Sequence, residues 1–183
     1  MTPALILVDV IRAFFDPRGV HYYPESENVL DALRRLLERA REHDRLVVHA
    51  VERHRAGLPD FEQPKLPEHC FEGDWQSDFW AGFEPSDRAR EIVVPKRRYS
   101  AFFATDLALT LRELDVDTVV VAGVKANVCI RATCQDAFAH GFRVVLPRQA
   151  TNSNRPHLGA ASVEDVERYF GEAPDIDQVL EWL

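Results

Sequence analysis

Three residues with complementary chemistry each fall just beyond a predicted apolar strand: Asp9, Lys96 and Cys129. A cysteine thiolate attacks carbonyl carbon atoms, and a carboxylate can take the thiol proton and later return it to a leaving amine. An ammonium group beside them stabilises the thiolate and orients the carboxylate. Each residue taken singly has an ordinary structural explanation, as a small core residue, a turn cap or a solvated charge. Their joint placement favours a nucleophilic hydrolase, with Cys129 attacking and Asp9 serving as acid and base.

The segment around Cys129 carries the strongest part of this argument. Residues 119–122 are small and apolar and predict a buried strand, which Gly123 ends before a short turn. Cys129 then opens the next predicted helix, at the carboxyl edge of the sheet, where open α/β folds bind their ligands. The partial positive charge of a helix N-terminus favours thiolate over thiol. We therefore expect Cys129 to be a reactive nucleophile.

Apolar strands and helices alternate along the chain, and this pattern must position the three residues. We expect buried strands over residues 4–9, 45–51, 91–94, 118–122 and 142–146, and helices over 24–40, 105–114, 127–140, 162–170 and 176–183. Asn127 and Ser162 are expected to cap two of these helices. Strands that are apolar on both faces are typical of a parallel sheet covered by helices. The fold class is therefore α/β, a three-layer αβα sandwich with a mainly parallel, Rossmann-like sheet.

Composition indicates one domain and argues against several classes of protein. A chain of 183 residues with 46% hydrophobic content can bury a full core, and no break in composition divides residues 1–183. The net charge of −8 argues against a nucleic-acid partner, and no apolar run approaches the ~20 residues that cross a membrane. There is no secretory signal pattern, and the three cysteines show no disulfide pattern. We expect a cytoplasmic protein with no membrane or nucleic-acid partner.

Three motifs together resemble the isochorismatase-like cysteine hydrolase superfamily, which includes nicotinamidases and N-carbamoylsarcosine amidohydrolases. They are LVDVIRAF around Asp9, PKRRYSAFF around Lys96 and GVKANVCIRATCQDA around Cys129, and the likeness covers nearly the whole chain. The resemblance implies the isochorismatase-like hydrolase fold, with these three residues as a catalytic triad. It further implies an acyl-thioester intermediate that water hydrolyses, and a homo-oligomer, either a dimer or a tetramer.

The same resemblance implies how the turn before Cys129 works. It places a non-proline cis peptide between Val124 and Lys125, which would aim the backbone N–H groups of Lys125 and Cys129 at the developing oxyanion. Lys125 stands where the family usually has a small residue, and this second cation beside the pocket would influence the choice of substrate. The family's substrate-facing positions correspond here to Phe14 and Phe102.

A second constellation predicts a metal site in the long irregular segment 52–90, a kind of loop that is usually functional. Nicotinamidase-like members bind a divalent metal through an Asp-x-His after the second strand and a later Pro-x-His-Cys. This chain has ERH at 52–54 and PEHC at 67–70, so Glu52, His54 and His69 correspond, with Glu in place of Asp. Carboxylate and imidazole ligands suit zinc, iron or manganese. The alternative is that His54 is solvated and His69 packs within the loop, with no cofactor required.

These observations predict hydrolysis of a C–N bond in a small carboxamide or ureido substrate, with release of ammonia or an amine. One alternative is an isochorismatase-type vinyl-ether hydrolase, a branch that commonly lacks the cysteine. Another is a non-catalytic binding or scaffold protein that keeps only the fold. Retention of Asp9, Lys96 and Cys129 argues against both alternatives, although the spacing of these residues encodes no particular substrate.

Overall fold

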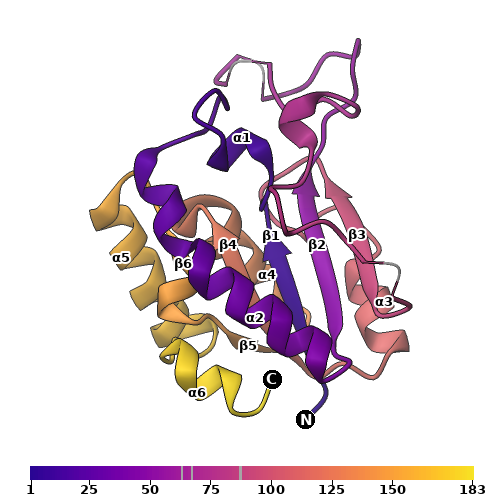
Figure 1. Cartoon of the computed structure of the whole chain (residues 1–183), viewed down its shortest axis with the longest axis vertical. Coiled ribbons are helices and arrows are strands. Elements are labelled where there is room, and N and C mark those ends of the chain that lie inside the picture. The colour runs from indigo at the N-terminus through magenta and orange to yellow at the C-terminus, as the bar shows by residue number, and fades with distance from the viewer. Residues whose placement is uncertain (63, 67, 87) are drawn as a thin grey trace.

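A six-stranded sheet forms the centre of the molecule (Figure 1). The computed structural model describes residues 1–62, 64–66, 68–86 and 88–183. The strands are β1 (Pro3–Val8), β2 (Leu46–Glu52), β3 (Glu91–Lys96), β4 (Thr118–Val124), β5 (Arg143–Val145) and β6 (Thr151–Asn152). They lie in the order β3-β2-β1-β4-β5, and β6 pairs with the carboxyl end of β4. All these pairings are parallel, so the carboxyl ends of the strands share one edge.

Helices cover both faces of this sheet. They are α1 (Arg12–Phe15), α2 (Leu30–Glu42), α3 (Leu107–Glu113), α4 (Arg131–Ala139), α5 (Pro156–Asp165) and α6 (Ile176–Leu180). Along β1, Leu5 and Leu7 join the apolar cluster under α2 and α6, whereas Ile6 and Val8 join the cluster under α3 and α4. Burial of both faces explains why the strands are apolar throughout. The predicted three-layer α/β sandwich with a mainly parallel sheet is confirmed.

Several element boundaries differ from the sequence predictions for identifiable reasons. β3 continues through Pro95 to Lys96, because it is an edge strand and the missing N–H of a proline is tolerated there. The helix expected from Ser162 begins earlier, at Pro156, and Ser162 Oγ donates to the Leu158 carbonyl inside it. Proline is well suited to the first turn of a helix, where its N–H is not needed.

Gly123 allows β1 and β4 to approach closely beneath the carboxyl edge. Its φ is +125°, and a Cβ atom at this position would collide with the carbonyl oxygen of Val8. No other residue type fits this conformation and this spacing. β4 continues one residue beyond Gly123 to Val124, so Gly123 does not end the strand as the sequence predicts. The close approach brings the chain after β4 next to the chain after β1.

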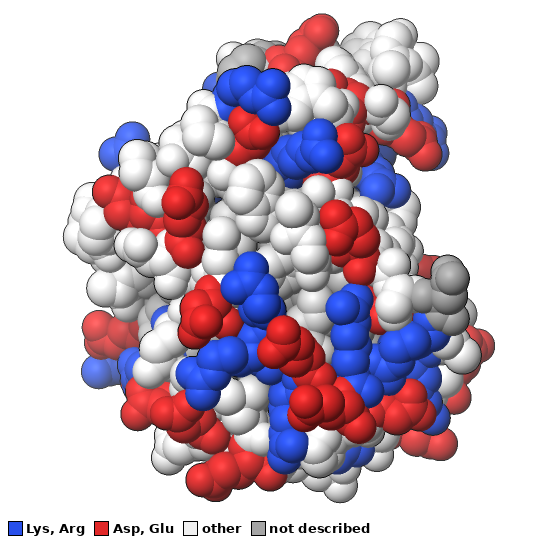
Figure 2. Space-filling view, in the orientation of Figure 1, with Lys and Arg blue, Asp and Glu red and all other residues white. Residues whose placement is uncertain are grey.

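Much of the described chain between β2 and β3 lies beyond the carboxyl ends of those strands, on the same side as α1, before it returns along the sheet to the start of β3 (Figure 1). On the face shown in Figure 2, basic and acidic side chains are interspersed. The helix α2 contributes to this mixture of charges, and its Arg35 pairs with Asp177 of α6. Within the described ranges, we find no helix with the length and apolar character that crossing a membrane requires.

Candidate active site

Asp9, Lys96 and Cys129 meet in one buried cluster at the carboxyl edge of the sheet. Lys96 Nζ lies 2.8 Å from Asp9 Oδ2 and 3.6 Å from Cys129 Sγ. Asp9 directly follows β1, and its Oδ1 accepts a 2.8 Å hydrogen bond from the Glu52 backbone N–H. Lys96 is the last residue of β3, and its side chain is fully buried. The structure thus brings together the three side chains that the sequence singled out.

Burial controls the protonation state of this cluster. It raises the pKa of the Cys129 thiol well above its usual range, and the Lys96 ammonium only partly offsets the effect. It also raises the pKa of Asp9, again opposed by Lys96. For Lys96, burial disfavours the charge, but Asp9 and Cys129 outweigh burial and raise the pKa. At rest the cluster therefore holds a thiol beside an ammonium–carboxylate pair, and Asp9 is the base nearest to the thiol proton.

The turn that carries Cys129 differs from a simple helix N-terminus. The peptide bond between Val124 and Lys125 is cis, at the position that the resemblance implies. A π-helical turn then runs over Ala126–Ile130, so Cys129 lies inside it rather than opening the helix. Asn127 does not cap this helix, because its Oδ1 accepts a 2.6 Å hydrogen bond from Ser153 Oγ. From the sequence, a helix N-terminus is expected to favour the thiolate of Cys129. In the structure, burial outweighs this effect and raises the pKa of the thiol.

A small cavity of about 160 Å³ opens onto Cys129. Its lining consists of Phe14, His21, Glu52, Leu66, Tyr99, Lys125, Val128 and Cys129. Of the two residues predicted to face the substrate, Phe14 lines this cavity and Phe102 is not among its lining residues. Phe102 packs against His140 and Phe142, with ring centroids 5.5 and 5.9 Å away, in the cluster beneath α3 and α4.

Sequence reasoning did not assign His21, Leu66, Tyr99 or Val128 to the pocket. His21 belongs to no motif. The return of the chain after α1 places the centroid of its ring 4.5 Å from that of the His69 ring. Tyr99 and Val128 lie close to Lys96 and Cys129 in sequence, and that proximity is the one signal that could have found them. Leu66 comes from the long segment after β2. The path of this segment cannot be predicted from hydrophobic periodicity.

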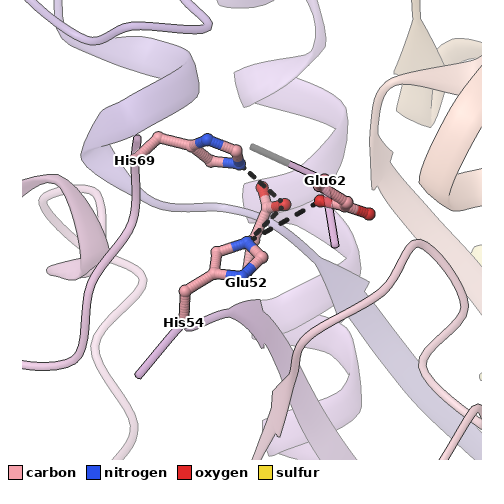
Figure 3. A group of neighbouring side chains, drawn as sticks. All are labelled: Glu52, His54, Glu62 and His69. Carbon is pink, nitrogen blue, oxygen red and sulfur yellow. Dashed lines mark hydrogen bonds and ion pairs between the residues drawn. The ribbon is translucent and has the colours of Figure 1, made fainter. Parts of the chain in front are cut away.

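A second cluster of buried side chains lies beside this cavity, and Figure 3 shows its four members converging. Glu52 Oε1 lies 3.2 Å from His69 Nε2 and 3.4 Å from His54 Nε2. Glu62, which the sequence analysis did not assign, joins them with Oε2 at 3.9 Å from His54 Nε2. Pro67 of the predicted PEHC motif lies outside the described residues. The structure therefore brings the three predicted ligands together and adds a fourth.

The donor set of this cluster fits a divalent metal. Ligand atoms from Glu52, His54, Glu62 and His69 all lie within 4.8 Å of one another. Glu62 Oε2 is buried and accepts no hydrogen bond from any described residue. His54 Nδ1 contacts Asp60 Oδ2 at 2.9 Å, which turns His54 Nε2 toward the other donors. A carboxylate that orients a histidine in this way is typical of metal sites, and two imidazoles with two carboxylates suit zinc, iron or manganese.

The family model described as the Isochorismatase domain matches residues 3–178. The chain belongs to the isochorismatase family. This isochorismatase-family protein is 30% identical to the N-carbamoylsarcosine amidase of an Arthrobacter species, over 99% of this chain and 71% of the relative. It is 32% identical to the maleamate amidohydrolase of Pseudomonas putida, over 99% of this chain and 86% of the relative.

Solved structures of isochorismatase-like proteins have the same fold. An isochorismatase-like hydrolase from Alkaliphilus metalliredigens superposes with a TM-score of 0.92, at 31% identity over 99% of this chain and 98% of that one. The pyrazinamidase of Pyrococcus horikoshii, solved in complex with zinc, gives a TM-score of 0.85, at 27% identity over 96% of this chain and 99% of that one. The isochorismatase-family fold therefore extends over nearly the whole chain.

Proposed function

We propose that this isochorismatase-family protein is a cysteine hydrolase that cleaves a C–N bond of a small carboxamide or ureido compound. The observation that carries the proposal is the convergence of Asp9, Lys96 and Cys129 from three separate strand ends at one small cavity. The amidase activities named for the two curated relatives support the same reaction class. A vinyl-ether hydrolase or a scaffold protein would have no need of a thiol placed at the cavity.

In the first half-reaction, Asp9 removes the proton from the Cys129 thiol as Sγ attacks the carbonyl carbon of the amide. The Lys96 ammonium, 3.6 Å from Sγ, stabilises the sulfur as it becomes negative. The backbone N–H groups of Lys125 and Cys129 donate to the oxyanion, a contribution that typically changes rates by ~10²–10³. Asp9 then returns its proton to the leaving nitrogen, the C–N bond breaks and an acyl-thioester remains on Cys129.

In the second half-reaction, water hydrolyses this thioester. Asp9 accepts a proton from the water molecule while the water oxygen attacks the carbonyl carbon of the thioester. The C–S bond then breaks and a carboxylic acid is released. The proton returns to Sγ and restores the resting thiol, whose raised pKa favours this protonated form. Lys96 holds Asp9 in place through both steps by their 2.8 Å ion pair.

The cluster around Glu52 would hold a divalent cation through Glu52, His54, Glu62 and His69. When bound, such a cation supplies a Lewis acid at the wall of the cavity, since Glu52 is one of the lining residues. The zinc complex of the Pyrococcus horikoshii pyrazinamidase supports this part of the proposal. Glu52 also links the two clusters, because its backbone N–H donates to Asp9 Oδ1.

Protein purified without a chelator is expected to contain about one divalent metal ion per chain by elemental analysis. His54→Ala should remove it, and Glu62→Gln should lower its affinity by about 10- to 100-fold, because each loses a donor from the cluster. Glu72→Gln is the matched control, since Glu72 is an exposed carboxylate of the same segment outside the cluster. Sub-stoichiometric metal that His54→Ala leaves unchanged would exclude this site.

We further propose that residues 1–183 act as one isochorismatase-like domain in a cytoplasmic homo-oligomer, a dimer or a tetramer. The two apolar clusters on the faces of a single sheet support the single domain. All three cysteines are free thiols, which suits a reducing compartment. Light scattering of the purified protein measures the number of chains in the assembly.

The reaction is tested by screening small carboxamides and ureido compounds for ammonia release, together with labelling by iodoacetamide at neutral pH. Cys129 is expected to react first, because it lines the cavity and has Asp9 as a base, whereas Cys70 and Cys134 are fully buried. Activity should disappear in step with the labelling of Cys129. No ammonia release across the panel, with Cys129 reacting no faster than the other two thiols, would support the scaffold alternative instead.

A further inference from the structure

Lys125 brings a half-buried cation into the cavity that Cys129 lines. No described residue forms an ion pair or a hydrogen bond with its ammonium group. Burial lowers the pKa of Lys125, and the Cys129 sulfur and the Glu52 carboxylate only partly offset this effect. A charge that is kept from water without a partner gains most from an anion that enters the cavity.

Two aromatic rings orient this ammonium group. Lys125 Nζ lies 5.8 Å from the centroid of the Phe14 ring and 5.3 Å from that of the Tyr23 ring. Phe14 is buried, and the Tyr23 hydroxyl is fixed because it donates a 2.6 Å hydrogen bond to Asn152 Oδ1. Cation–π contacts hold a cation over ring faces without neutralising its charge. Lys125 is therefore positioned while its N–H donors remain available to a ligand.

We propose that Lys125 anchors a carboxylate of the substrate, so that the protein prefers small amides that also carry a carboxylate group. This inference rests on the proposed function, because it assigns the specificity of the same cavity. The cavity volume is about 160 Å³, so a molecule with its amide carbon at Cys129 also comes within reach of Lys125. The monoamide of a short dicarboxylic acid and a ureido acid are the compounds that fit this description.

The other residues that line the cavity indicate where a substrate carboxylate can bind. Glu52 lines the same cavity, and its Oε1 faces away to the two imidazoles, 3.2 Å from His69 Nε2 and 3.4 Å from His54 Nε2. A glutamate side chain carries no N–H donor and no cation for a second carboxylate. Phe14, Leu66 and Val128 are apolar and offer it no partner. Among the described lining residues, Lys125 supplies the cation that a substrate carboxylate needs.

A cation near Cys129 also has a general effect, because it stabilises a thiolate or an oxyanion whatever the substrate. That effect is equal for charged and neutral amides, whereas an anchor acts only on the charged ones. Succinamate and succinamide separate the two roles, since they differ only in a carboxylate that is replaced by a second carboxamide. Malonamate and glutaramate, each with its own diamide, extend the comparison to shorter and longer spacings.

In wild-type protein we expect kcat/KM for at least one monoamide to exceed that for its diamide. Lys125→Met should reduce this ratio by about 10- to 100-fold, the range expected when a charge-assisted hydrogen bond is lost. Lys125→Arg keeps the cation and should retain most of the preference. A ratio that Lys125→Met leaves unchanged would overturn the inference and assign Lys125 the general role instead.

Binding to Cys129→Ala protein provides a readout that does not depend on turnover. By calorimetry, the same monoamide should bind about 10- to 100-fold more weakly when Lys125→Met is added. Equal dissociation constants with and without Lys125, or no binding of any of the three monoamides, would refute the anchor. Binding that depends on Lys125 in a protein that releases no ammonia would instead refute the proposed hydrolysis and leave the anchor standing.

Discussion

Replacing Cys129 by alanine is expected to lower ammonia release by about 10⁴-fold or more while the fold remains intact. The thiol is the one nucleophile of the described cluster, and neither Asp9 nor Lys96 can form the acyl-thioester in its place. The substitution removes a single buried sulfur and leaves the 2.8 Å pair between Asp9 and Lys96 in place. The midpoint temperature of thermal unfolding should therefore change by only a few degrees. Steady-state ammonia release measures the loss of activity.

Cys134→Ala is the matched control for this prediction. Cys134 is also buried, but it lies in α4 within the apolar cluster, and burial alone accounts for its raised pKa. We expect Cys134→Ala to retain activity within a few-fold and to lose about 1–2 kcal/mol of stability, because it leaves a small void in the core. Appreciable turnover by Cys129→Ala protein, or an equal loss in the control, would exclude Cys129 as the nucleophile.

Replacing Lys96 by methionine is expected to damage both activity and stability. Without the ammonium group, the fully buried Asp9 carboxylate has lost its ion-pair partner at 2.8 Å. Breaking a buried pair in this way typically destabilises a protein by about 3–5 kcal/mol. The stranded carboxylate also gains a proton and can no longer act as a base, so kcat should fall by about 10³-fold or more. Chemical denaturation and steady-state kinetics measure the two effects.

The double variant Asp9→Asn with Lys96→Met separates the two causes. It removes both buried charges, so most of the lost stability should return while activity stays absent. The free energy of unfolding of the wild type, the two single variants and the double variant gives the coupling energy of the pair. A double variant as unstable as Lys96→Met alone would mean that Lys96 acts through packing of its side chain rather than through its charge.

The local sequence was sufficient to predict the fold class and the elements that carry the reactive residues. Runs such as residues 119–122 are apolar at every position, and only a strand covered on both faces requires that. In a parallel sheet, strand ends far apart in the chain share one edge, so Asp9, Lys96 and Cys129 could be expected to meet. Their predicted convergence depended only on strand direction, which the alternation of strands and helices determines.

Long-range packing decided the features that local patterns could not predict. β6 has two residues and exists because β4 offers it an edge at Gly123 and Val124. Phe102 follows Lys96 about as closely as Phe14 follows Asp9, yet it packs against Phe142 and is not one of the residues that line the cavity. Glu62 lies beside Glu52, His54 and His69 because of the path of a long irregular segment, which hydrophobic periodicity does not predict.

The sequence by itself determined the chemical types at this site: a thiol, a carboxylate and an ammonium at three strand ends, and a second cation at Lys125. Only the tertiary structure decided their protonation and their partners, because burial and neighbouring charges from distant segments control both. The same fold leaves Lys96 paired with Asp9 and leaves the Lys125 ammonium in the cavity without an anion from any described residue. That difference in surroundings, and not residue type, assigns the two lysines to different roles.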